Sequence, residues 1–247
     1  MTEDAVKPHY GYYSLYMFAA LSAIIFVIGV LITVFVWWLP GIVVMGFGFY
    51  FAISYVFSMR FFRETESFEL PPLLELKGDE QVLDVGCGLG KTAIGVAKHL
   101  TTGKVTGIDI WSTVEIPGNS SERAYLNAKI ECVQDKVEFK TGNVLSIPFP
   151  DNSFDLVTSS SVINNLQGDT AKTEAFHEIL RVLRPGGRFL LIEPLRDRWG
   201  FLTFTLLGVW MLLPKDRWIA LLERAGFTNL KYKYYDHLGM SLAEKPE

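Results

Sequence analysis

Apolar residues follow two different patterns along the chain. Residues 10–59 contain no Asp, Glu, Lys or Arg. A helix that crosses a bilayer needs about 20 predominantly apolar residues, and the segments 15–39 and 41–59 both satisfy this requirement. Pro40-Gly41 lies at their junction and predicts a turn. The pattern therefore predicts two membrane-spanning helices that form a hairpin.

Two other interpretations of this apolar region were weighed against membrane spans. A secretory signal has a shorter apolar core that leads to a small-residue cleavage site, whereas here a second apolar segment follows. A buried helical hairpin in a soluble core normally has a polar face, and neither segment has one. A pair of membrane spans fits the pattern better than either alternative.

Charge at the ends of the second segment predicts how the hairpin is oriented. Arg60 and Arg63 follow this segment, whereas the connection WWLPG carries no charge. Positive residues stay on the cytoplasmic side of a membrane. Two crossings return the chain to its starting side, so we expect a multi-pass membrane protein. Residues 1–63 would form the hairpin region and residues 64–247 a cytosolic domain.

Strand and helix patterns alternate in residues 64–247. Such alternation is typical of βαβ units, which build a parallel sheet with helices on both faces. Ligands of these sheets bind at the carboxyl ends of the strands. The predicted strands are 81–85, 104–110, 136–142, 154–160 and 188–193, and the predicted helices are 91–100, 120–133 and 170–183.

A glycine-rich segment, VLDVGCGLGKT at 82–92, follows the first predicted strand. The phosphate loop of ATPases needs a glycine five residues before the glycine of Gly-Lys-Thr, and that position is Val85. The dinucleotide loop needs a third glycine three residues after the second, and that position is Lys91. Both kinds of nucleotide loop are therefore excluded by spacing.

The pattern that remains is Asp84-x-Gly86-x-Gly88-x-Gly90, with the acid at the end of the strand. A carboxylate at this place would repel a pyrophosphate and attract a ligand that carries an ammonium and a sulfonium. The glycines allow the backbone to approach a ligand closely.

This loop resembles the first motif of class I S-adenosylmethionine-dependent methyltransferases, and further segments resemble the same family in its order. They are Asp109 at the end of the second strand, GNVLSIPFPDNSFDLV (142–157) and RVLRPGGRFLLIE (181–193), and residues 221–245 resemble the terminal helix and strand pair. The type 11 and quinone-methyltransferase branch is the most similar. The resemblance implies a Rossmann-like, doubly wound, mostly parallel seven-stranded sheet and S-adenosyl-L-methionine as the cofactor.

The resemblance also implies roles for particular residues. Asp109 would accept hydrogen bonds from the ribose hydroxyls. Asn143 stands where the family usually has an aspartate that meets the adenine amino group, and its amide oxygen can still accept that bond. Val144 would contact the ring through its backbone. The cofactor residues implied in this way are Asp84, Gly86, Gly88, Gly90, Asp109, Asn143 and Val144.

Residues for the chemical step are less well marked. Asn164, Asn165 and Glu193 follow the fourth and fifth strands and are the candidates, with loop capping and turn hydrogen bonding as their alternative role. A general base is needed only if the acceptor must lose a proton. His177 lies on a helix remote from the strand ends, and Cys87 is interpreted as a small filler within the loop.

Several classes of partner are excluded. A net charge of −4 offers no footprint for nucleic acid, and the Pro-Pro-aromatic motif of amino-methylating nucleic-acid enzymes is absent after strand four, where the chain reads Ser-Ser-Ser-Val from Ser159. Two cysteines and four scattered histidines have no metal-ligand spacing, so no metal site is expected.

A second apolar stretch, residues 199–214, is too short to span a bilayer comfortably. It would be an interfacial segment, a lid over the acceptor or a helix packed on the hairpin. Together the patterns predict a membrane-anchored methyltransferase of a lipophilic small molecule such as a quinone, prenyl lipid or phospholipid head group. A soluble acceptor such as a thiol, or a non-catalytic cofactor-binding scaffold, is the alternative. Removal of residues 1–60 is expected to leave cofactor affinity nearly native.

Overall fold

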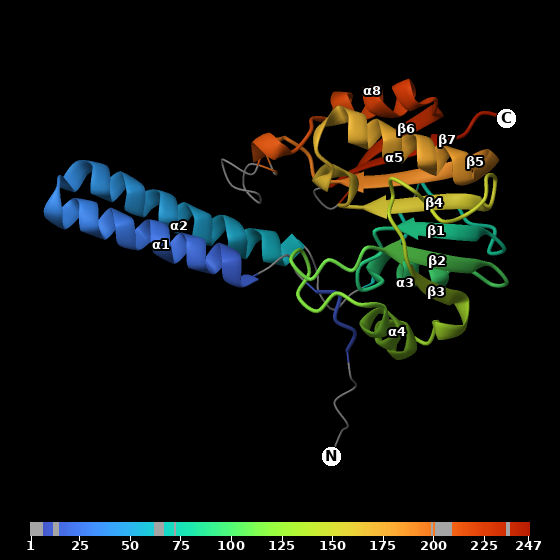
Figure 1. Ribbon diagram of the computed structural model, residues 1–247, viewed down its shortest axis with the longest axis horizontal. Helices are drawn as coiled ribbons and strands as arrows, with labels where there is room; N and C mark the ends of the chain where they lie inside the picture. The colour runs from blue at the N-terminus through green and yellow to red at the C-terminus, as the bar shows by residue number, and fades with distance from the viewer. Residues whose placement is uncertain are drawn as a thin grey trace, which may run out of the picture.

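A helical hairpin precedes an α/β domain in the computed structural model of the protein (Figure 1). The hairpin leaves the domain on the side to which the parallel strands point. The structure describes residues 7–11, 15–61, 67–71, 73–198, 200, 209–235 and 238–247.

The domain is built on a seven-stranded sheet of order β3-β2-β1-β4-β5-β7-β6. All neighbouring strands pair in parallel except β7, which is antiparallel to both β5 and β6. The expected mostly parallel, doubly wound fold is confirmed. The strands are β1 (Gln81–Val85), β2 (Lys104–Asp109), β3 (Val137–Thr141), β4 (Phe154–Ser160), β5 (Leu183–Glu193), β6 (Thr228–Tyr235) and β7 (Leu238–Glu244).

Helices cover both faces of this sheet. Buried side chains of α3 and α4 share one core cluster, and those of α5 and α8 share the other. The helices are α3 (Lys91–Ala97), α4 (Ser121–Ile130), α5 (Gly168–Val182) and α8 (Lys215–Ala225), with short 3-10 helices η1 (Gln134–Lys136), η2 (Ile163–Asn165) and η3 (Val209–Met211).

Alternating side chains of the strands supply these two cores. In β5, Phe189 and Leu191 belong to the α5 side, whereas Leu190 and Ile192 belong to the α3 side, and all four are buried. The ring centroids of Phe176 on α5 and Phe189 lie 5.8 Å apart, within the range of favourable aromatic pairs. A strand that is buried on both faces is apolar along its whole length, which explains the continuous pattern FLLI.

The hairpin consists of α1 (Leu15–Phe35) and α2 (Trp38–Phe61). The predicted turn at Pro40-Gly41 is wrong, because the helices are separated at residues 36–37 and Pro40 lies in the first turn of α2. Proline is tolerated there, since the first N–H groups of a helix have no partner within the helix.

Close backbone approach holds the two hairpin helices together. A Cβ atom on Gly29 would lie 2.6 Å from the backbone nitrogen of Met45, and one on Gly48 would lie 2.9 Å from that of Phe26. The outer faces of the hairpin remain apolar and exposed, with Val34 66% and Phe49 64% accessible. Large exposed apolar surfaces mark sites of contact with a protein or a membrane.

Among the described residues, one helical segment, Trp38–Val56, is long and apolar enough to cross a membrane, with a mean hydropathy of 1.7. The apolar segment of α1, Ala19–Phe35, is shorter. Length and composition alone support this assignment, so the pair of spans stays a prediction.

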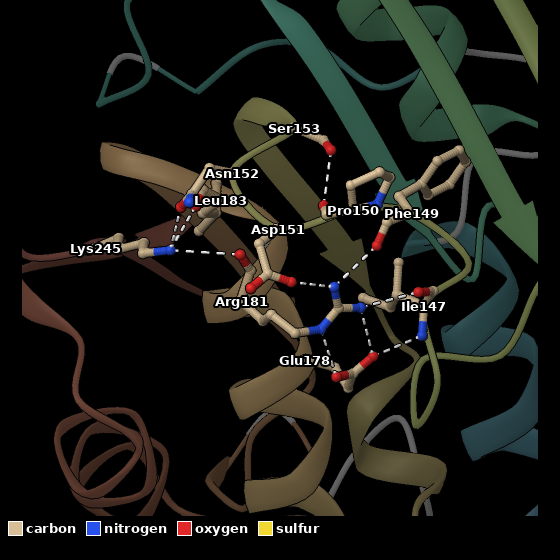
Figure 2. Close-up of polar contacts among 10 residues, drawn as sticks. All are labelled: Ile147, Phe149, Pro150, Asp151, Asn152, Ser153, Glu178, Arg181, Leu183 and Lys245. Atoms are coloured by element: carbon tan, nitrogen blue, oxygen red, sulfur yellow. Dashed lines mark hydrogen bonds and ion pairs between the residues drawn. The ribbon is translucent and has the colours of Figure 1, made fainter.

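Arg181 ties the connection between β3 and β4 to α5 (Figure 2). Its guanidinium donates to the carbonyl oxygens of Ile147 at 3.0 Å and Phe149 at 2.9 Å, and to the carboxylate of Glu178 at 2.8 Å. The same carboxylate accepts the N–H of Ile147 at 2.8 Å. This network positions the connection that starts at residues 142–144, where the sequence predicts a cofactor contact.

Candidate active site

A cavity of about 650 Å³ lies at the carboxyl edge of the sheet. The loops that follow β1, β2, β3 and β4 contribute to its lining. This volume falls within the range of small-molecule sites. The position agrees with the rule that open α/β sheets bind ligands beyond the carboxyl ends of their strands.

The glycine loop forms the floor of the cavity. Gly86 and Gly88 line it and have φ angles of +68° and +51°, a region that favours glycine. A Cβ atom on Gly86 would overlap the side chain of Val162. The backbone of the loop can therefore approach both a ligand and the neighbouring loop.

Asp84 and Gly90 belong to this loop region but do not line the cavity. The carboxylate of Asp84 accepts the N–H of Ala93 at 3.0 Å and the hydroxyl of Thr158 at 2.7 Å. Burial raises the pKa of Asp84 to about 7, which reduces its negative charge near neutral pH. The structure thus gives Asp84 a capping contact with α3 in place of a direct ligand contact, and Gly90 is the N-cap residue of that helix.

Asp109 is nearly buried at the end of β2 and lines the cavity. Its carboxylate accepts the N–H of Gly88 at 2.8 Å, the N–H of Trp111 at 2.7 Å and the side-chain amide of Asn119 at 3.1 Å. Two carboxylate oxygens have about four acceptor positions, so capacity for a further donor remains.

Asn119 also lines the cavity and was missed by the sequence analysis. Its oxygen Oδ1 is buried and has no hydrogen-bond partner. Buried acceptors normally have a donor, so this atom can accept a hydrogen bond from a group bound beside Asp109. Only the three-dimensional loop brings Asn119 to Asp109, since nine residues without helix or strand lie between them.

Asn143 and Val144 both line the cavity, as expected. The side-chain oxygen of Asn143 accepts the N–H of Leu145 at 2.9 Å. This turn uses one of the two lone pairs of the amide oxygen and leaves the second for a ligand.

Comparison with known proteins agrees with this geometry. Residues 83–191 match the family model described as Methyltransferase domain. A demethylmenaquinone methyltransferase of Symbiobacterium thermophilum is 32% identical over 169 residues, which cover 68% of this chain and 62% of that protein. A ubiquinone/menaquinone biosynthesis C-methyltransferase of Roseobacter denitrificans is 32% identical over 117 residues, which cover 47% of this chain and 43% of that protein.

Residues 83–191 are therefore similar to the methyltransferase family, and the domain has the fold of S-adenosylmethionine-dependent methyltransferases. A crystal structure of an S-adenosylmethionine-dependent methyltransferase from Methanosarcina mazei has a TM-score of 0.58 at 22% identity, covers 72% of this chain and is itself 99% covered, which shows the fold. S-adenosyl-L-methionine is the cofactor that this family and fold imply, and the unpaired oxygen of Asn119 beside Asp109 fits its ribose. The chain covers only 43–62% of the length of these two curated relatives.

The cavity has a second end beyond β4, β5 and the start of β7, where aliphatic side chains lie beside Ser160, Ser161 and Asn165. Of the candidate residues for the chemical step, Asn165 lines this end, whereas Asn164 and Glu193 do not. The apolar residues that line it are Val162, Leu166, Ile192, Leu238 and Met240.

Glu193 is buried beneath the loop that follows β4. Its Oε1 atom accepts the N–H groups of Val162 at 3.1 Å, Ile163 at 2.8 Å and Asn164 at 3.3 Å. The ammonium of Lys172 holds the other end of this loop, because it donates to the carbonyl oxygens of Asn164 and Leu166. Glu193 therefore positions η2, which agrees with the capping role weighed for it.

Two other side chains have the roles expected from the sequence. Burial, together with the charges of Asp84 and Asp109, raises the pKa of the Cys87 thiol, which disfavours the thiolate that a nucleophile needs. His177 is exposed on α5 and does not line the cavity.

Two segments outside the sheet also line the cavity. Tyr10 and Gly11 precede the hairpin, and Ser67 and Phe68 follow it. The expectation that removal of residues 1–60 leaves cofactor affinity nearly native stays a prediction, because Tyr10 and Gly11 line this cavity. Of the apolar insert 199–214, residues 199 and 201–208 lie outside the described residues.

The burial of Glu193 predicts a pH-dependent stability. Its pKa is raised to about 8 by burial, so between pH 5 and 8 the folded state binds more protons than the unfolded state and stability falls as pH rises. Glu193→Gln keeps an oxygen acceptor for the three N–H groups without this titration. Chemical denaturation measures the free energy of unfolding at pH 5 and pH 9. Between these two values the free energy of unfolding of the variant should rise, relative to that of the wild type, by on the order of 1–3 kcal/mol.

Glu178→Gln is the matched control for this measurement. Hydrogen bonding to Arg181 lowers the pKa of Glu178, so this carboxylate is already ionised in both states above pH 5. The stability difference between Glu178→Gln and the wild type should stay constant from pH 5 to 9. If the free energies of unfolding of the wild type and Glu193→Gln changed in parallel from pH 5 to 9, the raised pKa of Glu193 would be contradicted.

Proposed function

We propose that this protein transfers a methyl group from S-adenosyl-L-methionine to a lipophilic small molecule at a membrane surface. The observation that carries the proposal is a single cavity with two chemically different ends. Asp109 and Asn119 place a carboxylate and an amide at one end, and the other end combines aliphatic side chains such as Leu166 and Met240 with Ser160, Ser161 and Asn165. A polar cofactor and an apolar acceptor would meet between them.

The protein's contribution to this reaction is mainly positioning. The cofactor supplies a methyl group that its sulfonium already activates, so orientation of the two reactants supplies most of the catalysis. Asp109 and Asn119 would hold the ribose, and the backbone of Gly86 and Gly88 would support the methionine part. Asn165 lies at the acceptor end with Ser160 and Ser161, and its amide can orient a carbonyl or hydroxyl group.

Two observations support a lipophilic acceptor. The curated relatives in Symbiobacterium and Roseobacter carry names that concern menaquinone and ubiquinone. The hairpin presents exposed apolar helices on the side of the domain where the cavity lies. Trp210 and Met211 on η3 add further apolar surface, at 69% and 77% exposure. An acceptor dissolved in the bilayer could then enter the cavity without crossing water.

Methyl transfer is tested with labelled S-adenosyl-L-methionine and a membrane lipid extract. We expect label in an apolar product that partitions into organic solvent. Label in a water-soluble thiol would favour the soluble-acceptor alternative, and cofactor binding without any labelled product would favour a non-catalytic scaffold.

Asp109→Ala should weaken cofactor binding by about 1.5–3 kcal/mol, the scale of hydrogen bonds to a charged group. Calorimetric titration with S-adenosylhomocysteine measures this loss. Asp135→Ala is the control, because Asp135 is exposed and does not line the cavity. Equal affinity of Asp109→Ala and the wild type would show that Asp109 does not hold the ribose.

The proposed membrane topology predicts that the hairpin connection and the C-terminal end of the domain are accessible from opposite sides of the membrane. In a Cys132→Ser background, which removes the exposed native cysteine, one cysteine is placed near Gly41 and another after Lys245. A membrane-impermeant thiol reagent should reach the first only from the non-cytoplasmic side and the second only from the cytosol. Labelling of both from one side of sealed vesicles would rule out two spans.

A further inference from the structure

Two short segments that flank the hairpin lie against the cofactor cavity. Residues 7–11 precede α1 and residues 67–71 follow α2. Both therefore connect the hairpin to the walls of the same cavity. The residues that line it are Tyr10 and Gly11 from the first segment and Ser67, Phe68 and Glu69 from the second.

Asn127 on α4 fastens the first segment to the glycine loop. This side chain is 4% exposed. Its Oδ1 accepts the N–H of His9 at 3.0 Å, and its Nδ2 donates to the carbonyl oxygens of His9 and Leu89, each at 3.0 Å. Leu89 belongs to the glycine loop, so one buried amide holds both the N-terminal segment and the floor of the cavity.

A polar chain links the first segment to the second. The hydroxyl of Tyr10, a residue 5% exposed, donates to Glu131 at 3.2 Å. The other oxygen of Glu131 pairs with the ammonium of Lys98 at 2.7 Å, and this ammonium donates to the hydroxyl of Ser67 at 2.7 Å. Burial and the charge of Glu131 raise the pKa of Tyr10, so its hydroxyl stays a donor at neutral pH.

Gly11 packs directly against the cavity wall. Its φ of +73° is in the region that favours glycine, and a Cβ atom there would lie 2.7 Å from Ile116 and 3.1 Å from Leu89. Ile116 in turn lies 3.1 Å from the Cβ position of Gly88. The N-terminal segment thus contacts the loop after β2 and the glycine loop at the same time.

We propose that residues 7–11 form a strap, positioned by Asn127, that closes the cavity over bound S-adenosyl-L-methionine and slows its release. The strap rests on the proposed function, because it requires the cofactor to occupy this cavity. Only three residues separate the strap from α1, so movement of the hairpin relative to the domain would change cofactor retention. The membrane region would then be part of the cofactor site as well as an anchor.

Hydrogen–deuterium exchange of the full-length wild type tests the strap without altering the chain. Saturating S-adenosylhomocysteine should slow exchange in residues 7–11 and in the glycine loop, whereas α8, which lies outside the cavity, should be unchanged. Protection of the glycine loop without protection of residues 7–11 would overturn the strap and leave the proposed function standing. Absence of binding by the wild type would instead overturn the proposed function.

Deletion variants measure the effect of the strap on release. Deletion of residues 1–11 should raise the dissociation rate of S-adenosylhomocysteine about tenfold or more and change its association rate little, since release becomes easier while the floor of the cavity remains. Deletion of residues 1–6 keeps the whole strap and is the matched control. Equal dissociation rates for the two deletions would refute the strap.

Point variants separate the strap from a general loss of stability. Tyr10→Ala should also speed dissociation, because it removes a buried ring that lines the cavity. Tyr10→Phe keeps that ring and should recover most of the wild-type dissociation rate. An equal increase for both variants would overturn the role assigned to the ring, and thermal unfolding without ligand identifies any variant that is simply unstable.

Discussion

The carboxylate of Asp84 is the contact on which the site depends. It lies at the end of β1, accepts an N–H from the first turn of α3 and accepts a hydroxyl from β4. These two bonds join the central strands of the sheet to the helix that follows the glycine loop. The carboxylate is buried, so its removal would leave the N–H of Ala93 and the hydroxyl of Thr158 without an acceptor. Each unpaired buried donor costs about 1–3 kcal/mol.

The glycine loop transmits this arrangement to the rest of the cavity. Its backbone donates to Asp109 through Gly88, and its carbonyl at Leu89 accepts the amide of Asn127. Asp109 then organises the loop that brings Asn119 into the cavity. The polar end of the cavity, which we assign to the cofactor, is therefore built outward from one strand end by hydrogen bonds between backbone and side chains.

Much of the domain could be predicted from its sequence. The residues of β1 and β4 were predicted without error, because apolar runs there are bounded by turn residues and are buried on both faces. The start of β5 was placed five residues late, since the pattern LRPGG contains proline and glycine, which normally end a strand. The hairpin turn was misplaced because proline is equally compatible with the first turn of a helix.

The site was only partly predictable, for a related reason. Spacing identified the glycine loop, and the resemblance to the methyltransferase family identified Asp109; both are local features of the chain. The contacts of Asn127 with His9 join residues 118 positions apart, and no periodic pattern signals such a pair. The capping role of Asp84 could not be predicted, because an acid that contacts the ligand and an acid that caps the following helix stand at the same place in the sequence pattern.

We propose that this cavity selects S-adenosyl-L-methionine through the geometry of the glycine loop and Asp109. Calorimetric titration of the protein in detergent with S-adenosylhomocysteine, NAD and ATP tests this selectivity. We expect saturable binding of S-adenosylhomocysteine at one site per chain and no comparable heat with NAD or ATP. Comparable binding of either nucleotide, or no binding of S-adenosylhomocysteine, would contradict it.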